Sequence, residues 1–338
     1  MRNHNRAARR LVLLGVASLA TIALAACAPA TTGGGGATDD PAAALPRSIE
    51  IVVPGDPGGG GDVLARQLAK SAEEITGTRI IVVNKPGAGG QTALQYCASQ
   101  PADGSCVVHV SRSVITLNPY ISESRYTYED VRGVFRVQID PTYIAVGKDS
   151  PYKTIDDLVK AAKKSEGALT IVSGAVGSVE YVLVKQLEQA AGFTSSYVPY
   201  EGGSTVGLDL AGGHSEVGII NASDNLDLIN SGQVRLLAVA RPERTDIFPD
   251  VPTLAESGYD VGDLDQWRGF VVPKDTPQDV IDALDTLFTK AIDTDDFKAY
   301  QEASGLLPGV LDQKEFNAMM KDQSAAAQAL FKQLGVGQ

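Results

Sequence analysis

Three glycine-rich stretches of the sequence could bind an anion through their backbone N–H groups. The first covers residues 54–62 (PGDPGGGGD) and directly follows the apolar run 51–53. Four consecutive glycines are costly to order, because glycine loses more backbone freedom on folding than any other residue. They make sense where side chains must be absent. The other two stretches are residues 85–90 (KPGAGG) and 173–178 (SGAVGS).

Each stretch lies between a predicted strand and a predicted helix. Strands are predicted at residues 48–53, 79–84 and 169–172, and the helices that follow them at 62–75, 91–99 and 178–191. The first N–H groups of a helix have no partner within the helix. They point out of its N-terminus, which is the positive end of the helix dipole. Asp62 is expected to cap the first helix. The three loops are therefore natural seats for an anion.

The rest of the chain repeats this alternation of short β-branched runs and helical patterns. Further strands are predicted at 106–110, 143–147, 216–220, 234–240 and near Phe270, and further helices at 154–164 and from near Pro277, Thr294 and Gln313. Such alternation predicts an α/β protein with mostly parallel sheets. Ligands of these proteins bind beyond the carboxyl ends of the strands, where all three loops lie.

The sequence does not match the common motifs for catalysis or nucleotide binding. Val63 and Thr92 stand where G-x-G-x-x-G would need its last glycine, and neither loop continues into Gly-Lys-Ser/Thr. No G-x-S-x-G nucleophile elbow occurs. No pair of carboxylates stands out by its spacing. We therefore predict that the protein binds a ligand without turnover, is not an enzyme, and needs no cofactor.

The amino terminus predicts export and lipidation. Four arginines precede an apolar segment at residues 11–26, which is too short and alanine-rich for a membrane span. Residues 1–26 are therefore predicted to be a signal peptide. It ends Leu24-Ala25-Ala26-Cys27, in the order of a bacterial lipobox, so Cys27 is the predicted lipidation site. The alternative is an ordinary signal peptide that happens to contain a cysteine. Residues 31–46 read as a flexible tether, which would hold the protein at the extracytoplasmic face of the membrane.

The charge of the mature chain excludes a nucleic-acid partner. Removal of residues 1–26 leaves 25 basic against 41 acidic residues, whereas nucleic-acid binding requires basic patches. A small anion is not excluded, because a pocket can offer backbone N–H groups. The length suffices for two domains.

Two cysteines remain beyond Cys27. Cys97 falls near the end of a predicted helix, and Cys106 opens the next strand. In an oxidising compartment they predict a disulfide, and the alternative is two small buried thiols. A metal site is poorly supported, because the mature chain has only His109 and His214.

Six motifs in order resemble the receptors of tripartite tricarboxylate transporters, also called the Bug family. They cover nearly all of the chain after residue 47. The motifs are IVVP…PGGG…D at 51–62, NKPGAGG at 84–90, PYEGG at 199–203, LAV with Arg241 and Arg244, PDVPTLAE at 249–256 and WRG at 267–269. Any one of these motifs alone is weakly specific.

The resemblance implies a type II periplasmic-binding-protein fold, in which two α/β domains close on a ligand. Domain 1 would comprise residues 47–140 plus 250–338, and domain 2 residues 141–249, with crossings near Asp140–Tyr143 and Ala240–Pro252. It also implies that the first two glycine loops grip a ligand carboxylate through N–H groups and ordered water. We expect a monomer that captures a small organic carboxylate for membrane transporter subunits. The alternative is a receptor of the same fold that presents its ligand to a membrane sensor kinase.

The sequence departs from the family pattern at several positions. The family usually has an aromatic residue at Gly55, a proline at Asp56, a hydroxyl residue at Gly61, a glycine at Ala175 and a histidine at Tyr181. The ligand of citrate-binding relatives therefore cannot be assumed for this chain. Asp56 would add negative charge that favours a ligand with an amine, unless it points to solvent and caps a turn.

Other residues at the ends of strands could also reach the ligand. Arg112 could pair with a second carboxylate or be a surface arginine, and Ser223 or Asp224 could face the cleft or cap a helix. Trp267 is expected in the core more than against ligand. The predicted ligand contacts are Pro57, Gly58, Gly59, Gly60, Asp62, Pro86, Gly87, Ala88, Gly89, Gly90, Ser111, Arg112, Gly177, Ser178, Tyr200 and Asn221.

Overall fold

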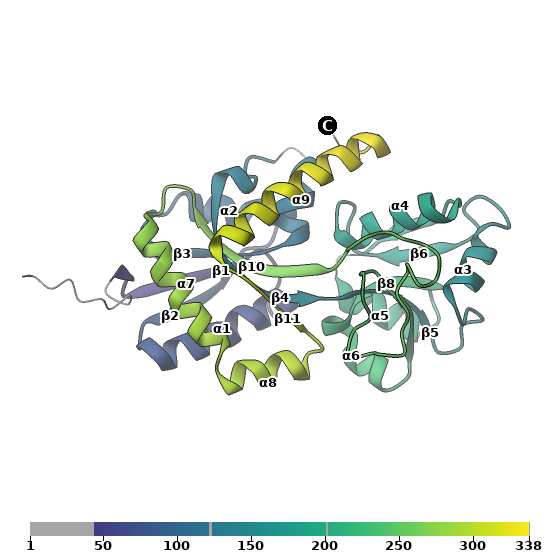
Figure 1. The fold of residues 1–338 in the computed structure, drawn as a ribbon, viewed down its shortest axis with the longest axis horizontal. Helices are drawn as coiled ribbons and strands as arrows, with labels where there is room; N and C mark the ends of the chain where they lie inside the picture. The colour runs from purple at the N-terminus through teal and green to yellow at the C-terminus, as the bar shows by residue number, and fades with distance from the viewer. Residues whose placement is uncertain (1–43, 122–123, 201, 338) are drawn as a thin grey trace, which may run out of the picture. The chain divides into compact units, whose positions relative to one another are not determined.

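Two β-sheets organise the protein in the computed structural model, which describes residues 44–121, 124–200 and 202–337. The predicted signal peptide, Cys27 and most of the tether lie outside these residues. One sheet has six strands in the order β11-β4-β10-β3-β1-β2, and the other has five in the order β7-β6-β8-β5-β9 (Figure 1). The six-stranded sheet is built by the two ends of the chain, and the five-stranded sheet by its middle.

The elements follow one another in an α/β pattern. The strands of the six-stranded sheet are β1 (Ser48–Val53), β2 (Arg79–Asn84), β3 (Cys106–Ser111), β4 (Val131–Asp140), β10 (Gln266–Pro273) and β11 (Leu307–Leu311). Those of the five-stranded sheet are β5 (Thr142–Gly147), β6 (Thr170–Ser173), β7 (Ser196–Pro199), β8 (Val217–Asn221) and β9 (Val234–Val239). The helices are α1 (Gly60–Thr76), α2 (Gln91–Ala98), α3 (Ile155–Ala162), α4 (Val179–Ala191), α5 (Gly203–Ala211), α6 (Ala222–Asn230), α7 (Gln278–Ile292), α8 (Asp295–Ala303) and α9 (Gln313–Leu334). Short helical turns are η2 (Ala88–Gly90), η3 (Ser113–Leu117), η4 (Asn118–Tyr120) and η5 (Tyr128–Asp130).

Both sheets are mixed, so the expectation of mostly parallel sheets was wrong. β1 pairs in parallel with β2 and β3, and β6 pairs in parallel with β7 and β8. β10 runs antiparallel to β3 and β4, and β5 runs antiparallel to β8 and β9. The parallel pairs are joined by helical crossovers, as parallel pairing requires. Strands β5 and β10 enter from the other sheet without such a crossover, and both pair antiparallel with their neighbours. Strand β11 also runs antiparallel to β4.

The chain passes between the sheets at two places. The first lies at Pro141, between β4 and β5. The second was expected near Ala240–Pro252, but the segment after β9 stays with the five-stranded sheet: Leu264 N–H donates to the Ala240 carbonyl, and Leu254 and Leu264 are buried in that sheet's core. We therefore propose a boundary near residue 265 instead of 250.

Helix α9 packs against the cores of both sheets. Phe316 and Met320, in its first half, are buried with Trp267 of the six-stranded sheet. Ala327 and Phe331, in its second half, are buried in the core of the five-stranded sheet. In Figure 1 it is the long yellow helix. The fold thus joins its two sheets through β4–β5, through the segment before β10, and through α9.

A disulfide joins Cys97 at the end of α2 to Cys106 at the start of β3. Their Cα atoms are 5.5 Å apart, and the bridge closes a loop with a sequence separation of 9. Restricting the unfolded chain over a loop of this length stabilises the fold by about 2–3 kcal/mol. The bridge anchors β3, which carries His109 and Ser111.

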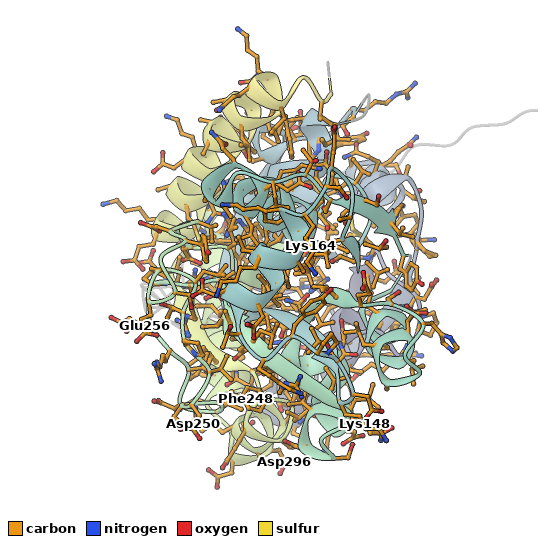
Figure 2. All side chains as sticks on the ribbon, turned by 90° about the vertical axis from the view of Figure 1, so that its right-hand side faces the viewer. Lys148, Lys164, Phe248, Asp250, Glu256 and Asp296 are labelled. Atoms are coloured by element: carbon orange, nitrogen blue, oxygen red, sulfur yellow. A yellow bond between two sulfur atoms is a disulfide. The ribbon has the colours of Figure 1, made fainter. Side chains whose placement is uncertain are left out.

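Most charged side chains lie at the surface. Lys148, Lys164, Asp250, Glu256 and Asp296, all labelled in Figure 2, are exposed. Buried charges are therefore exceptional in this fold, and three of them, Asp62, Glu180 and Arg268, line the site described next. Among the described residues, no helix is both long enough and apolar enough to cross a membrane.

Candidate functional site

A cavity of ≈ 400 Å³ is lined by elements of both sheets. From the six-stranded sheet come the loop between β1 and α1, the side chains of His109 and Ser111 on β3, and Arg268 on β10. From the five-stranded sheet come the loop after β6, the start of α4, Tyr200 and the end of β8. The size fits a small organic molecule. We call this cavity the cleft.

The first turn of α1 borders the cleft with free backbone donors. The helix begins at Gly60, with Gly59 as its N-cap, so Asp62 is the third helical residue and not the predicted cap. The Asp62 carboxylate accepts the Gly58 N–H at 2.9 Å and pairs with Arg66 at 2.9 Å. The Asp62 carboxylate therefore already binds the Gly58 N–H, which was expected to bind the ligand. Among the described residues the N–H groups of Gly60 and Gly61 have no hydrogen-bond partner.

Two glycines of the run are required by buried side chains beneath them. A Cβ on Gly60 would lie 2.6 Å from Nη2 of Arg268, and a Cβ on Gly61 would lie 2.7 Å from Cε1 of His109. Real Cβ contacts are longer than this. Side chains must be absent here because two polar groups of β3 and β10 fill the space under the helix start.

His109 is a buried, neutral imidazole. Its side chain is only 5% exposed, packs edge-on against Phe270, and has no hydrogen-bond partner on either ring nitrogen among the described residues. Burial, helped by the nearby charge of Arg268, lowers the pKa of His109 to about 3. The ring can therefore donate one hydrogen bond and accept another, but it does not supply positive charge.

Arg268 and Asp140 form a buried ion pair beside the cleft. Nη2 of Arg268 lies 2.7 Å from Oδ2 of Asp140, and both side chains are less than a tenth exposed. Oδ2 of Asp140 also accepts the Ser223 hydroxyl at 2.5 Å, and Oδ1 accepts the Ser223 N–H at 3.3 Å. Burial raises the pKa of Asp140, and the charge of Arg268 opposes the rise. Ser223, one of the residues expected either to face the cleft or to cap a helix, thus binds Asp140.

Two further carboxyl groups line the cleft from the five-stranded sheet. Glu180, in the first turn of α4, is 8% exposed, and burial raises its pKa. Asp224, in the first turn of α6, lies against Gly203, where a Cβ would be 2.4 Å from its Oδ2. Among the described residues neither carboxylate has a salt bridge. The cleft therefore contains more negative than positive side-chain charge.

The second glycine loop does not reach the cleft. Pro86, Gly87, Ala88, Gly89 and Gly90 are absent from its lining. The Gly89 carbonyl accepts from Asn118 at 3.1 Å, and a Cβ on Gly90 would lie 2.5 Å from Val114, which itself lines the cleft. The turns that follow β3 thus stand between this loop and the cavity.

The third loop lines the cleft at residues other than those predicted. Gly174 and Ala175 border it, whereas Gly177 packs near Ile121. The Ser178 hydroxyl caps α4 by accepting the Tyr181 N–H at 3.2 Å. Ser178 is therefore a helix cap in this structure.

The remaining predictions divide between the cleft and the scaffold. Gly59, Gly60, Asp62, Ser111, Tyr200 and Asn221 line the cleft, whereas Pro57 and Gly58 do not. Arg112 is half-buried and donates to the carbonyls of Asp263 and Asp265 at 3.0 and 3.1 Å, so it holds the segment before β10 in place. Trp267 is buried, and its Nε1 donates to Gln323 at 2.8 Å. Asp56 is exposed at the edge of the cleft.

Sequence reasoning overlooked three titratable cleft residues, His109, Glu180 and Arg268. Asp224 was expected either to face the cleft or to cap a helix, and it lines the cleft. Two of the three overlooked residues carry a usable signal, because His109 interrupts the apolar strand CVVHVS and Arg268 the apolar strand QWRGFVV. A titratable residue in a buried strand calls for a partner or a function. Glu180 carries no such signal, since acidic residues in a first helical turn are common.

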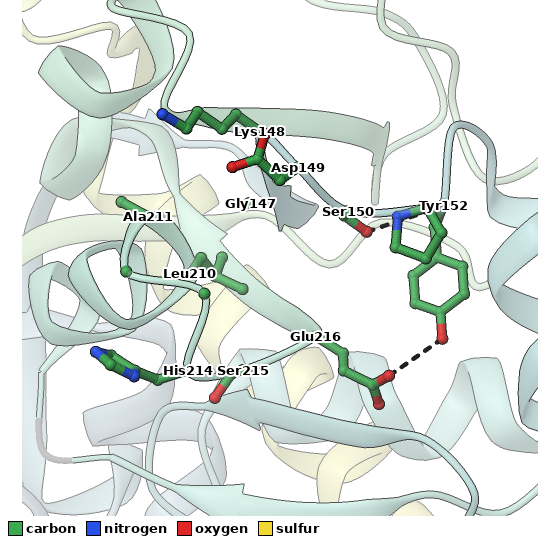
Figure 3. Close-up of a pocket in the computed structure, with 13 residues that line it drawn as sticks. Gly147, Lys148, Asp149, Ser150, Tyr152, Leu210, Ala211, His214, Ser215 and Glu216 are labelled. Atoms are coloured by element: carbon green, nitrogen blue, oxygen red, sulfur yellow. Dashed lines mark hydrogen bonds between the residues drawn. The ribbon is translucent and has the colours of Figure 1, made fainter.

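A second hollow lies at the far end of the five-stranded sheet. Figure 3 shows it between the loop after β5 and the loop between α5 and β8. The Tyr152 hydroxyl donates to Glu216 at 3.3 Å across it. None of the predicted contact residues lines this hollow. Within the described part of the chain, no group of three or more His, Cys, Asp or Glu residues could hold a metal ion.

The fit of His109 under Gly61 predicts the effect of a methyl group. Gly61→Ala should destabilise the protein by about 1–3 kcal/mol, because the new Cβ overlaps the buried ring. Gly55→Ala, where a Cβ meets nothing within 4 Å, is the control and should change little. Urea unfolding measures both. Adding His109→Ala to Gly61→Ala should reveal a favourable coupling in a double-mutant cycle. Equal stability of Gly61→Ala and wild type would show that the ring moves aside freely.

Asp265, at the second crossing, predicts a dependence of stability on pH. Burial raises its pKa to about 7, although Arg241 lies 3.3 Å away. Between the unfolded pKa of about 4 and this value, the folded state keeps a proton that the unfolded state releases. Raising the pH through this window therefore lowers stability, by at most about 1.4 kcal/mol per pH unit.

The variant Asp265→Asn isolates this contribution, because an amide does not titrate. The unfolding free energy of wild type minus that of the variant should fall as the pH rises from about 4 to 7 and level off above. Urea titrations across this range measure it. Parallel curves for the two proteins would mean that Asp265 is ionised throughout.

Comparison with known proteins identifies the family. Residues 64–336 match the model of the tripartite tricarboxylate transporter family receptor. BugT of Bordetella pertussis is 28% identical over 282 residues, which are 82% of this chain and 86% of that protein.

Solved structures share the fold. The periplasmic binding protein BugD is 27% identical with a TM-score of 0.76, covering 86% of this chain and 98% of that chain. The R. palustris protein Rpa4515, solved with adipate, is 25% identical with a TM-score of 0.78 and the same coverage. The chain therefore belongs to the tripartite tricarboxylate transporter receptors, the Bug family, and is a periplasmic solute-binding receptor with a type II periplasmic-binding-protein fold.

Proposed function

We propose that this receptor is a lipoprotein that captures a small organic carboxylate and delivers it to a transporter of the tripartite tricarboxylate type. The observation that carries the proposal is the first turn of α1, whose Gly60 and Gly61 N–H groups lie at the wall of the cleft and have no partner among the described residues. A carboxylate there would satisfy both donors and meet the positive end of the helix dipole.

The cleft supports binding more than catalysis. His109 is neutral and buried, and neither of its ring nitrogens accepts a hydrogen bond from a hydroxyl group of the described residues, so it activates no nucleophile there. The adipate-bound relative also supports a carboxylate ligand, since it shares the fold at 25% identity. The family description supports a transporter as the receiving partner.

The binding site is tested by thermal unfolding with a panel of mono-, di- and tricarboxylates, aromatic acids and amino acids. A ligand present at about 1,000 times its Kd stabilises the folded protein by about 4 kcal/mol, which should raise the Tm by several degrees. The amide of a binding acid should give no rise, because it lacks the charge.

The matched variants are Gly59→Val and Ala98→Val. Gly59 lines the cleft, so a valine there should remove the ligand-induced rise while leaving the circular dichroism unchanged. Ala98 is exposed at the end of α2, and its variant should respond as the wild type does. If Gly59→Val binds a panel acid as tightly as the wild type, the seat is not at α1.

The lipid anchor is tested separately at Cys27. The motif Leu24-Ala25-Ala26-Cys27 and the tether behind it support acylation of this cysteine. Cys27→Ser should release the protein into the medium or leave uncleaved precursor, as seen by membrane fractionation and intact mass. A mature-sized variant that still fractionates with membranes would show that Cys27 is not the anchor.

A further inference from the structure

The charges around Arg268 are out of balance. Its guanidinium interacts electrostatically with three carboxyl groups, those of Asp140, Asp224 and Glu180, but within the described part of the chain it forms a salt bridge only with Asp140. Asp62, the other buried acid of the cleft lining, is already matched by Arg66. Glu180 and Asp224 therefore have no salt-bridge partner of their own among the described residues.

An excess of negative charge is unfavourable in a buried site. Burial of Glu180 disfavours its charged form, and the neighbouring charge of Asp224 adds to that effect. A cationic group placed against the two carboxylates would remove both penalties and form charge-assisted hydrogen bonds.

A second observation shows that the same cavity is built to receive a polar ligand. His109 lines the cleft, is more than nine-tenths buried, and leaves both ring nitrogens without a partner among the described residues. Nη1 of Arg268 is likewise buried and without a partner there. Groups of this kind cost free energy unless a hydrogen-bonding molecule reaches them.

We propose that the ligand is an aminocarboxylate, whose carboxylate binds at the start of α1 and whose ammonium group binds Glu180 and Asp224. This proposal rests on the proposed function, because it assumes that the start of α1 binds the carboxylate. The second carboxylate of a dicarboxylate would instead face Glu180 and Asp224 and be repelled. The preference therefore differs from what the adipate-bound relative alone would suggest.

The test compares acids that differ only in the group at the far end. Glutarate is paired with γ-aminobutyrate, adipate with δ-aminovalerate, and succinate with β-alanine, and the common α-amino acids complete the panel. Isothermal titration and thermal unfolding should show that the aminocarboxylate binds more tightly than the diacid in at least one pair. Alternatively, an α-amino acid should bind more tightly than the diacid that lacks its amino group. A preference for the diacid in every pair would overturn the inference while leaving the proposed function standing.

Matched variants locate the ammonium site. Glu180→Gln and Asp224→Asn keep the shape of each side chain and remove its charge, so each should weaken the best aminocarboxylate by ten-fold or more and narrow its advantage over the diacid. Asp227→Asn, exposed one turn along α6 and outside the cleft lining, should bind as the wild type does.

Two other outcomes would also contradict the proposal. Aminocarboxylate binding that neither Glu180→Gln nor Asp224→Asn alters would overturn the assignment of these residues. Circular dichroism of each variant shows whether a loss of binding reflects a loss of fold. If no carboxylic acid of the panel binds at all, the proposed function fails and the inference fails with it.

Discussion

Asp140 and Arg268 meet where the chain leaves one sheet for the other. Arg268 lies on β10, Asp140 ends β4, and Ser223 of the five-stranded half donates twice to the same carboxylate. A buried pair of this kind adds little net stability, but losing one partner leaves an uncompensated buried charge and costs about 3–5 kcal/mol. The pair therefore fixes the geometry of the first crossing, and the surrounding sequence has to accommodate it.

The glycine run at the start of α1 is one result of that accommodation. Arg268 and His109 rise from neighbouring strands and fill the volume where side chains of Gly60 and Gly61 would stand. The helix can begin so close to the sheet only because both residues lack a Cβ. The same closeness brings the free N–H groups of the first turn to the wall of the cleft. Internal packing and ligand access thus both require glycine at positions 60 and 61.

The sequence predicts the elements of the fold better than their pairing. Strand-to-helix alternation and the glycine loops locate β1, β2 and β6 with their following helices, because these signals are local. Strand β4 was not predicted, and β10 was predicted only as a strand near Phe270 without its antiparallel pairing. That pairing is a long-range property, because β10 arrives from the other sheet. Arg112 was misassigned for the same reason: its partners, the carbonyls of Asp263 and Asp265, lie about 150 residues away in sequence and could not be anticipated.

Charge in the cleft follows from how each carboxylate is held. Asp62 folds back onto Gly58 and Arg66, and Asp140 is held by Arg268 and Ser223, so neither is free to bind a ligand. Glu180 and Asp224 form no salt bridge with a described residue, although both lie in the first turn of a helix, whose dipole partly stabilises negative charge. Their arrangement leaves an electrostatic preference inside a cavity whose size alone would admit many small acids. On this argument, selectivity in the receptor depends on which charges the scaffold leaves unpaired more than on the shape of the cavity.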